Sequence, residues 1–386
     1  MLFVRTEELK PGMRLAKPIY NRSGVLLYER NSRLTIPGIN SVRNFGLIGI
    51  YILEPAEPLP PYSKEDVEFE QAQTVYMFKL RDIYDKIYKR TAPDKLPSLI
   101  EDILARYGSL NHRVNFNQNH RSADDFMFKH AISTSILTAM ISQHIKMSDE
   151  DRNALIAASL IYGFGYRFVA RNILDKVTGL SKIDQDLIQH ALEKGVSYLQ
   201  ASHEELPFLP KALAIAEYFI LSSNPERTIN HPLPDILLLA EILRVAREFD
   251  LLTGMSLGHK PESEIMAMQH LREHPEIYQE SIVTLLAHCI HIIPAGASVD
   301  LSTKDKGIVL VENPQDYLHP LILRLSDNQL YDLSIPAVAQ KIQIVDLMKS
   351  MDNRIELDED TVKLFVADKR IIEMTERFRK SKENNK

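Results

Sequence analysis

The stretch Ala158-Ser-Leu-Ile-Tyr-Gly-Phe-Gly-Tyr166 lies in the middle of the chain and indicates how its central part folds. Its apolar residues predict the end of a buried helix. The pair of glycines in Gly163-Phe-Gly165 has no strand before it and is too short for a phosphate-binding loop. We therefore expect these glycines to allow close packing between helices.

The sequence around this stretch predicts a mainly α fold with β-rich ends. Residues 124–290 read as a helical core, with apolar residues at helical spacing and no internal repeat. Residues 55–123 combine a proline-containing linker with connector helices. Residues 1–54 predict a small β-rich domain with a short helix at Ile36–Phe45, because short apolar runs alternate with Pro-Gly and Ser-Gly turns. Residues 291–386 predict a β element and a terminal helix.

Composition narrows the class of protein. The 386 residues include 45% hydrophobic and 25% charged residues, which is typical of a globular protein with two or three domains. The formal net charge of −6 does not favour nucleic acid or an anionic membrane as a partner. Cys289 is the only cysteine, so no internal disulfide or thiolate metal site is available. A cytoplasmic location is expected, since no apolar run reaches the roughly 18 residues that span a bilayer.

Two segments near the ends of the chain carry a family resemblance. They are Leu9-Lys-Pro-Gly-Met-Arg-Leu-Ala-Lys-Pro-Ile19 with Gly24-Val-Leu-Leu27, and Ile293-Pro-Ala-Gly-Ala-Ser-Val-Asp-Leu-Ser302 with Gly307-Ile-Val-Leu-Val-Glu-Asn-Pro314. With them the chain resembles, over nearly its whole length, the bacterial HD-GYP proteins of the HD phosphohydrolase superfamily. This resemblance implies a helical HD-type core that opens cyclic di-GMP with a metal cluster.

The resemblance also assigns positions, and this chain keeps few of them. His130 matches the first metal-binding histidine, and Asp250 is the acidic residue kept in a later motif. Other family positions carry replacements, namely Tyr162, Gly163, Tyr166, Ala191, Tyr218, Phe219 and Arg247. The Gly-Tyr-Pro signature falls at Glu226-Arg227-Thr228 and is lost. His190 precedes the ligand position by one residue, which on a helix turns the side chain by about 100°, so we expect it to point elsewhere.

These replacements favour a protein without the family's chemistry. Phosphodiester cleavage by two metal ions needs several carboxylates and imidazoles to hold ions roughly 3.5–4 Å apart. His130 and Asp250 alone do not supply them, and we expect the two side chains to be buried and bonded to each other. The leading hypothesis is a catalytically inactive regulatory or scaffolding protein in bacterial cyclic di-GMP-related signalling. It would bind another signalling protein and need no cofactor.

Other interpretations stay open at this stage. Arg167, Arg171, Arg244 and Arg247 could hold the phosphates of cyclic di-GMP without cleaving it, or could pair with Asp175, Glu241 or Glu248. An active phosphohydrolase could bind iron or manganese through His130, His190, His231 and Asp250. The histidines His288 and His291 share a helical spacing but lack a nearby carboxylate in the sequence. The connector helix around Tyr76–Lys89 could pair with a second copy in a homodimer, or pack on the chain's own core.

Overall fold

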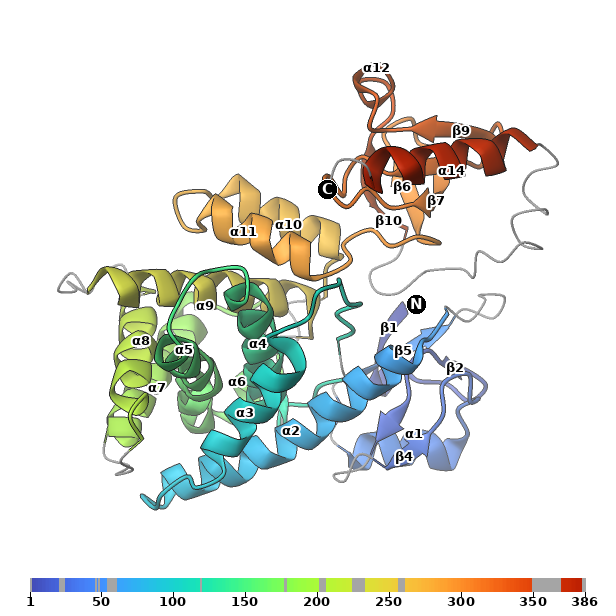
Figure 1. Cartoon of the computed structure of the whole chain (residues 1–386). Coiled ribbons are helices and arrows are strands. Elements are labelled where there is room, and N and C mark those ends of the chain that lie inside the picture. The colour runs from blue at the N-terminus through green and yellow to red at the C-terminus, as the bar shows by residue number, and fades with distance from the viewer. Residues whose placement is uncertain are drawn as a thin grey trace.

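The computed structural model describes residues 2–20, 25–45, 47, 49–53, 61–118, 120–176, 179–200, 206–223, 233–255, 261–348 and 369–383. Over these residues the fold is mainly α, with a small sheet near each end of the chain (Figure 1). The prediction of a mainly α fold with β-rich ends is therefore confirmed.

The N-terminal unit is a small antiparallel sheet with one covering helix. Its elements are β1 (Leu2–Arg5), η1 (Thr6–Glu8), β2 (Arg14–Leu15), β3 (Ile19–Tyr20), β4 (Leu26–Tyr28), α1 (Ile36–Asn44) and β5 (Gly49–Leu53). The sheet has the order β1-β5-β2, and β3 pairs with β4. Thr35 caps the predicted short helix by accepting a hydrogen bond from the backbone of Gly38. Every residue of β5 is buried, as expected for a central strand.

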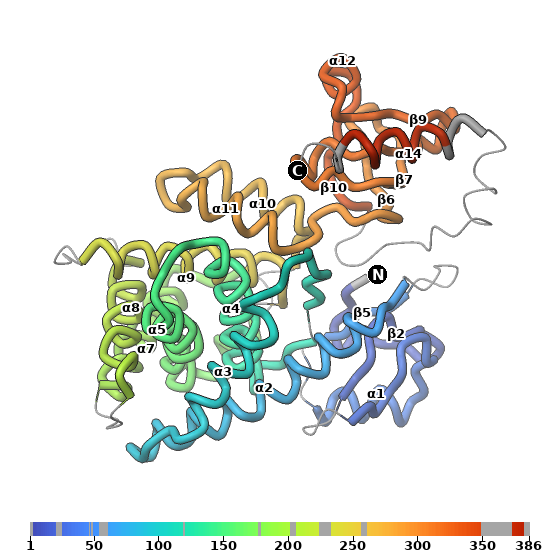
Figure 2. The backbone as a smooth tube through the Cα atoms, viewed as in Figure 1, coloured from blue at the N-terminus to red at the C-terminus, as the bar shows by residue number. Residues whose placement is uncertain are grey.

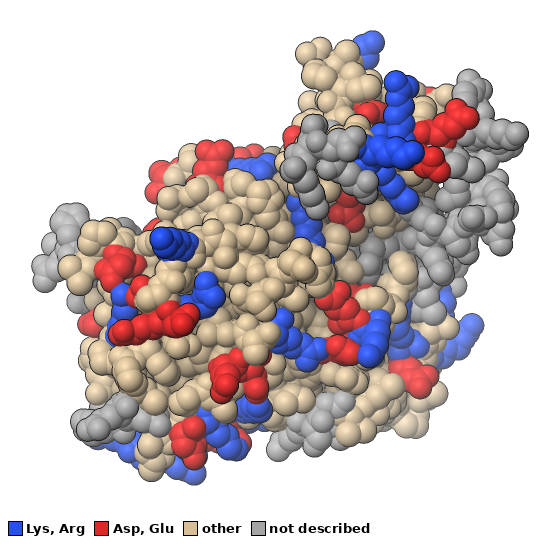
Figure 3. Space-filling view, viewed as in Figure 1, with Lys and Arg blue, Asp and Glu red and all other residues tan. Residues whose placement is uncertain are grey.

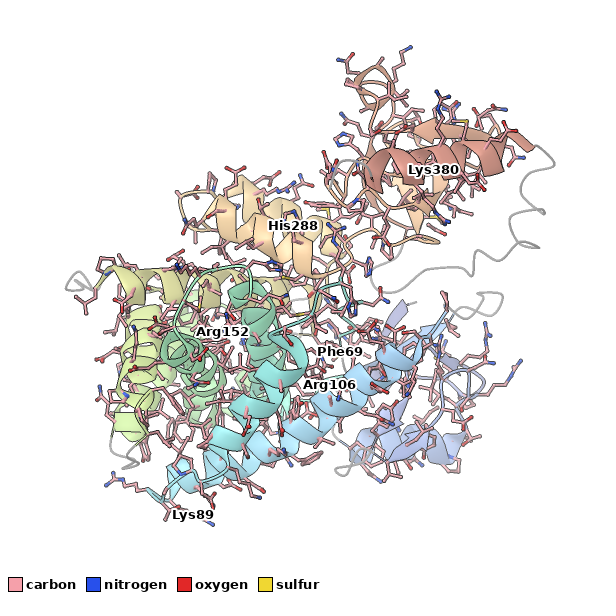
Figure 4. The ribbon with its side chains drawn as sticks, in the orientation of Figure 1. Phe69, Lys89, Arg106, Arg152, His288 and Lys380 are labelled. Carbon is pink, nitrogen blue, oxygen red and sulfur yellow. The ribbon has the colours of Figure 1, made fainter. Side chains whose placement is uncertain are left out.

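Two connector helices follow, α2 (Lys64–Tyr88) and α3 (Leu96–Tyr107). A capping box between Ser63 and Asp66 fixes the start of α2. Phe69 of α2 lies edge-on to Tyr107, where α2 and α3 meet (Figure 4). The apolar face of α2 is thus buried in the chain's own core, and a homodimer stays a prediction that this helix does not support.

The helical core is arranged around α4 (Phe126–Ser142), in which nearly every residue is buried. The other core elements are α5 (Asp149–Ile161), η2 (Tyr162–Phe168), α6 (Arg171–Leu174), α7 (Lys182–Gln200), α8 (Leu209–Ser222) and α9 (Pro234–Thr253). Helix α4 contacts α2, α3, α5 and α9, which places it at the centre of the bundle (Figure 2). Any pair of polar residues shared by α4 and α9 is therefore shielded from water.

Helix α7 crosses η2 at two glycines. A Cβ atom on Gly165 would lie 2.4 Å from the carbonyl oxygen of Ala191 and 2.4 Å from the Cα of Leu192. A Cβ on Gly195 would lie 2.7 Å from the Cα of Gly165. Any side chain here would force the two backbones apart. The expectation that both glycines of Gly163-Phe-Gly165 permit close packing is confirmed for Gly165 but not for Gly163, where a Cβ would meet its nearest neighbour at 3.5 Å.

The C-terminal part begins with α10 (Glu264–Glu273) and α11 (Glu280–Cys289), which lie between the core and the second sheet (Figure 2). Strands β6 (Ser298–Leu301), β7 (Lys306–Val311), β8 (Leu321–Arg324), β9 (Gln329–Asp332) and β10 (Ile344–Leu347) form an antiparallel sheet of order β10-β6-β7-β8-β9. Helix α12 (Pro336–Ala339) follows β9, and α14 (Lys369–Glu383) packs on β7.

The described helices and the face drawn in Figure 3 bear on membrane spans and on surface charge. None of the described helices is both long and apolar enough to cross a bilayer. On the face in Figure 3, lysine and arginine side chains alternate with acidic ones over the helical core. This mixed pattern agrees with the modest net charge.

Candidate functional site

The kept residues His130 and Asp250 meet where α4 crosses α9. Both side chains have no exposed surface. The Nδ1 of His130 donates a hydrogen bond to Oδ2 of Asp250 over 2.5 Å. The prediction that these two residues are buried and bonded to each other is confirmed.

Two residues of the segment before α4 bind the other oxygen of this carboxylate. Arg121 donates from Nη2 to Oδ1 of Asp250 over 2.5 Å, and Gln118 donates from Nε2 to the same oxygen over 3.1 Å. The Arg121 side chain is fully buried. Gly254 makes room for it, since a Cβ there would lie 2.8 Å from the guanidinium carbon. Asp250 therefore receives three hydrogen bonds from protein groups.

Tyr162 completes the network from the other side of the imidazole. Its hydroxyl lies 2.6 Å from Nε2 of His130. Because Asp250 keeps the proton of His130 on Nδ1, Nε2 is an acceptor and the tyrosine hydroxyl is the donor. The lone pair on Nε2, through which an imidazole would bind a metal ion, is therefore occupied by the hydroxyl of Tyr162, at a position where the resemblance expects a histidine.

The pKa shifts agree with this assignment of protons. Burial lowers the pKa of His130 despite the neighbouring Asp250, so the imidazole is neutral at pH 7. Burial alone would raise the pKa of Asp250, but Arg121 and the hydrogen bond from His130 outweigh it and hold this pKa at about 2. Burial raises the pKa of Tyr162, which keeps its hydroxyl protonated. These residues, together with Gln118, thus comprise one anion, one cation and three neutral partners.

We name Gln118, Arg121, His130, Tyr162 and Asp250 the central network. Aromatic rings enclose it. Phe219 of α8 lies edge-on to Tyr162 at 5.3 Å between ring centroids, and Tyr166 lies edge-on to Phe126 at 5.4 Å. Phe219 and Tyr166 stand where the resemblance expects a metal ligand and a phosphate contact, and their rings are buried, while Tyr218 is half-buried on α8.

The positions around Gly163 and Ala191 serve packing. A Cβ on Gly163 would meet Tyr166 and Tyr84 at ordinary contact distances. Ala191 is buried against Gly165, whereas His190 is exposed on α7, as the one-residue offset predicts.

The four candidate phosphate-binding arginines form ion pairs within the chain. On α9, Arg244 pairs with Glu241 at 3.1 Å and Arg247 pairs with Glu248 at 3.2 Å. Both guanidinium groups also lie over the ring of Phe219.

The other two arginines lie near the connector helix. Arg167 pairs with Asp85 at 2.8 Å, and Arg171 pairs with Asp124 at 2.6 Å and Asp175 at 3.6 Å. The predicted pairs with Asp175, Glu241 and Glu248 are present, so a phosphate would have to compete with these carboxylates.

The alternative metal ligands are not gathered in the part of the chain that can be described. There, no group of three or more His, Cys, Asp or Glu side chains is placed to hold a metal ion. His231 and the segment Glu226–Thr228 lie outside the described residues. His288 is exposed on α11 (Figure 4), while His291 binds Glu312 at 2.7 Å.

Sequence reasoning missed Gln118 and Arg121. They lie in an irregular segment, where no periodic pattern marks burial. One signal was available, because a buried aspartate needs a cationic or hydrogen-bonding partner, and an arginine shortly before the helix of His130 is a candidate.

The same segment ties the central network to the N-terminal unit. Lys17 donates from Nζ to the carbonyl oxygen of Gln118 over 2.8 Å and pairs with Glu70 of α2 at 3.4 Å. Both charged side chains are buried. The ring of His120 stacks on Tyr51 of β5 at 5.3 Å. His120 thus contacts the sheet through Tyr51, while Gln118 and Arg121 contact Asp250.

No protein-family model and no curated protein matches this chain in sequence.

Proposed function

We propose that this chain is a catalytically inactive HD-GYP-like protein that regulates or scaffolds bacterial cyclic di-GMP-related signalling in the cytoplasm by binding another signalling protein. The observation that carries the proposal is the hydrogen bond from Tyr162 to Nε2 of His130. It fills the coordination position of the one metal-binding histidine that the resemblance assigns and this chain keeps.

Electrostatics at Asp250 support the same conclusion. A metal ion at this carboxylate would sit beside the buried guanidinium of Arg121, whose Nη2 is already 2.5 Å from Oδ1. Two cations that share a buried site repel each other strongly, because the surroundings screen their charges poorly. Metal binding would therefore require the protein to expel Arg121 from its place against Gly254.

Binding of a protein partner is favoured over binding of the nucleotide. The arginines that could hold phosphates are already paired with carboxylates, and Arg247 stands where the family has a metal-binding aspartate. A nucleotide sensor would have to break these pairs before it gained new ones.

A hydrolysis assay tests the loss of activity. Protein prepared with iron or manganese is incubated with cyclic di-GMP, and linear product is measured beside a sample without protein. We expect equal product in both. Product that grows with protein concentration and disappears in Asp250→Asn would overturn the proposal and restore the phosphohydrolase hypothesis.

A binding titration distinguishes the hypothesis of a scaffolding protein from that of a nucleotide sensor. We expect no saturable heat when cyclic di-GMP is titrated into the wild-type protein. The protein would instead be a nucleotide sensor with its site on α9 if it bound cyclic di-GMP saturably, if Arg247→Glu abolished this binding, and if Arg171→Glu left it unchanged.

A further inference from the structure

A cavity lies between the N-terminal unit, α2 and the start of α4, and its lining includes no residue of the central network. Its volume is about 430 Å³. Its walls come from Ile19, Phe45, Phe78, Arg81, His120 and Lys129, among others. This volume falls within the roughly 300–1,000 Å³ that small-molecule sites occupy, and a boundary between domains is a usual place for one.

Arg81 gives the cavity an available positive charge. Its guanidinium group lies between two rings, 5.2 Å from the centroid of Phe78 and 5.1 Å from that of Phe128. Within the described ranges it has no carboxylate partner. The rings fix the position of the group but leave its N–H donors free of an anion. An arginine held in this way is suited to a carboxylate or phosphate.

His120 adds a buried polar group. The residue is 6% exposed, and in the described part of the chain neither ring nitrogen has a hydrogen-bond partner of ordinary geometry. Its pKa is lowered to about 3, mainly by burial and also by the charges of Lys17 and Lys129, while a backbone contact with Lys17 acts in the opposite direction. The neutral ring offers one donor and one acceptor, and a buried polar group without partners is costly unless a ligand or water satisfies it.

The remaining charges of the cavity balance one another. Lys129 pairs with Asp125 at 2.7 Å and donates to the carbonyl oxygen of His120 over 2.5 Å. Asp124 pairs with Arg171. The cavity lining thus has two cations, Arg81 and Lys129, and two anions, Asp124 and Asp125. Because both carboxylates already have a cationic partner, the guanidinium of Arg81 is left to bind an anion.

The apolar walls indicate the rest of the ligand. Phe45 and Phe78 contribute rings, and Ile19 and Met77 contribute aliphatic surface. Flat rings bind well against such walls by stacking. We propose that this cavity binds a small anion in which a flat ring carries a phosphate or carboxylate group. The site does not depend on whether the central network is catalytic.

Calorimetric titration tests this site with four probes. AMP carries a ring and a phosphate, and indole-3-acetate carries a ring and a carboxylate. Adenosine has the ring of AMP without its phosphate, and inorganic phosphate has the anion without the ring. We expect 1:1 binding of AMP or indole-3-acetate, with adenosine and phosphate clearly weaker than AMP. Absence of binding by both ring-bearing anions at millimolar concentration would overturn the proposal.

Variants place the binding in the cavity. Arg81→Ala should lower the affinity for the ring-bearing anion that binds by at least about tenfold, as expected for the loss of a hydrogen bond to a charged group. Arg106→Ala is the matched control, since Arg106 also lies over a ring, that of Tyr107, but does not line this cavity. Phe45→Ala should also weaken binding and is safe for folding, because Phe45 is 45% exposed. Unchanged affinity in both Arg81→Ala and Phe45→Ala would refute the site.

Discussion

At the scale of single residues, the central network explains how His130 and Asp250 are held in the core without a metal ion. The sequence predicted that His130 and Asp250 would bond each other, because the other metal ligands that the resemblance expects are replaced. It did not predict Arg121, which lies 129 positions from Asp250 in a segment without periodicity. Only the fold brings such distant residues together, so local sequence patterns predicted the bond between His130 and Asp250 but not the contacts of Gln118 and Arg121.

Removal of the buried anion tests the network. Asp250→Ala should lower the free energy of unfolding by about 3–5 kcal/mol, because Arg121 would remain buried without its anion. Urea denaturation followed by circular dichroism measures this change. Asp124→Ala breaks an exposed ion pair and should cost less than about 1 kcal/mol. Equal effects of the two variants would contradict the account.

The pH dependence of stability has a defined sign at His120. Its folded pKa of about 3 lies below the unfolded value of about 6.5. Between these values the unfolded chain binds a proton that the folded chain does not, so stability is full above about pH 6.5 and falls as the pH drops toward 3.

The variant His120→Gln should remove this contribution. Between pH 7 and pH 5 it should lose about 1–2 kcal/mol less unfolding free energy than the wild type. Parallel losses in both proteins would show that His120 becomes protonated without cost in the folded state.

At the scale of secondary-structure elements, proline and glycine residues indicated the strands of the N-terminal unit, whereas apolar residues at helical spacing indicated the helical core. The short strands after Pro11-Gly12 and Ser23-Gly24 and the helix at Ile36–Asn44 were expected from these signals. The order of the C-terminal sheet was not, because β10 pairs with β6 across more than forty residues and no local pattern encodes such a pairing.

Glycine substitutions test the crossing of α7 over η2. Gly165→Ala should destabilise the protein by about 1–3 kcal/mol, because its Cβ would meet the backbone of Ala191 and Leu192, which cannot give way as a flexible side chain can. Gly163→Ala is the matched control, since the nearest atom would be 3.5 Å away. Chemical denaturation of both variants should give a clear difference, and a Gly165→Ala protein as stable as Gly163→Ala would refute the close crossing.

At the scale of the whole molecule, buried polar contacts join the N-terminal unit to the helical core. Lys17 links the N-terminal unit to the helical part of the chain through Glu70 and Gln118, and Gln118 in turn binds Asp250. A small hydrophobic cluster of Ala16, Tyr51, Leu53 and Met255 adds to this interface. The sequence predicted the two units but not their attachment, because a lysine in a turn-rich segment is usually exposed.

Lys17→Ala should loosen this attachment. Glu70 would stay buried without its cation, so amide hydrogens of β5 should exchange with solvent faster than in the wild type, while those of α4 keep most of their protection. Hydrogen exchange with mass spectrometry measures both segments in one experiment. Lys10→Ala, which removes an exposed lysine of the same segment, should change neither. Unchanged exchange of β5 in Lys17→Ala would show that the ion pair does not hold the unit in place.

The most direct test of the central claim is the metal content of the purified wild-type protein, produced with iron and manganese supplied and without chelator. Because Tyr162 occupies Nε2 of His130 and Arg121 lies against Asp250, we predict no stoichiometric metal by elemental analysis. Two metal equivalents per chain that are lost in a folded His130→Gln variant would contradict the account and identify a working metal centre.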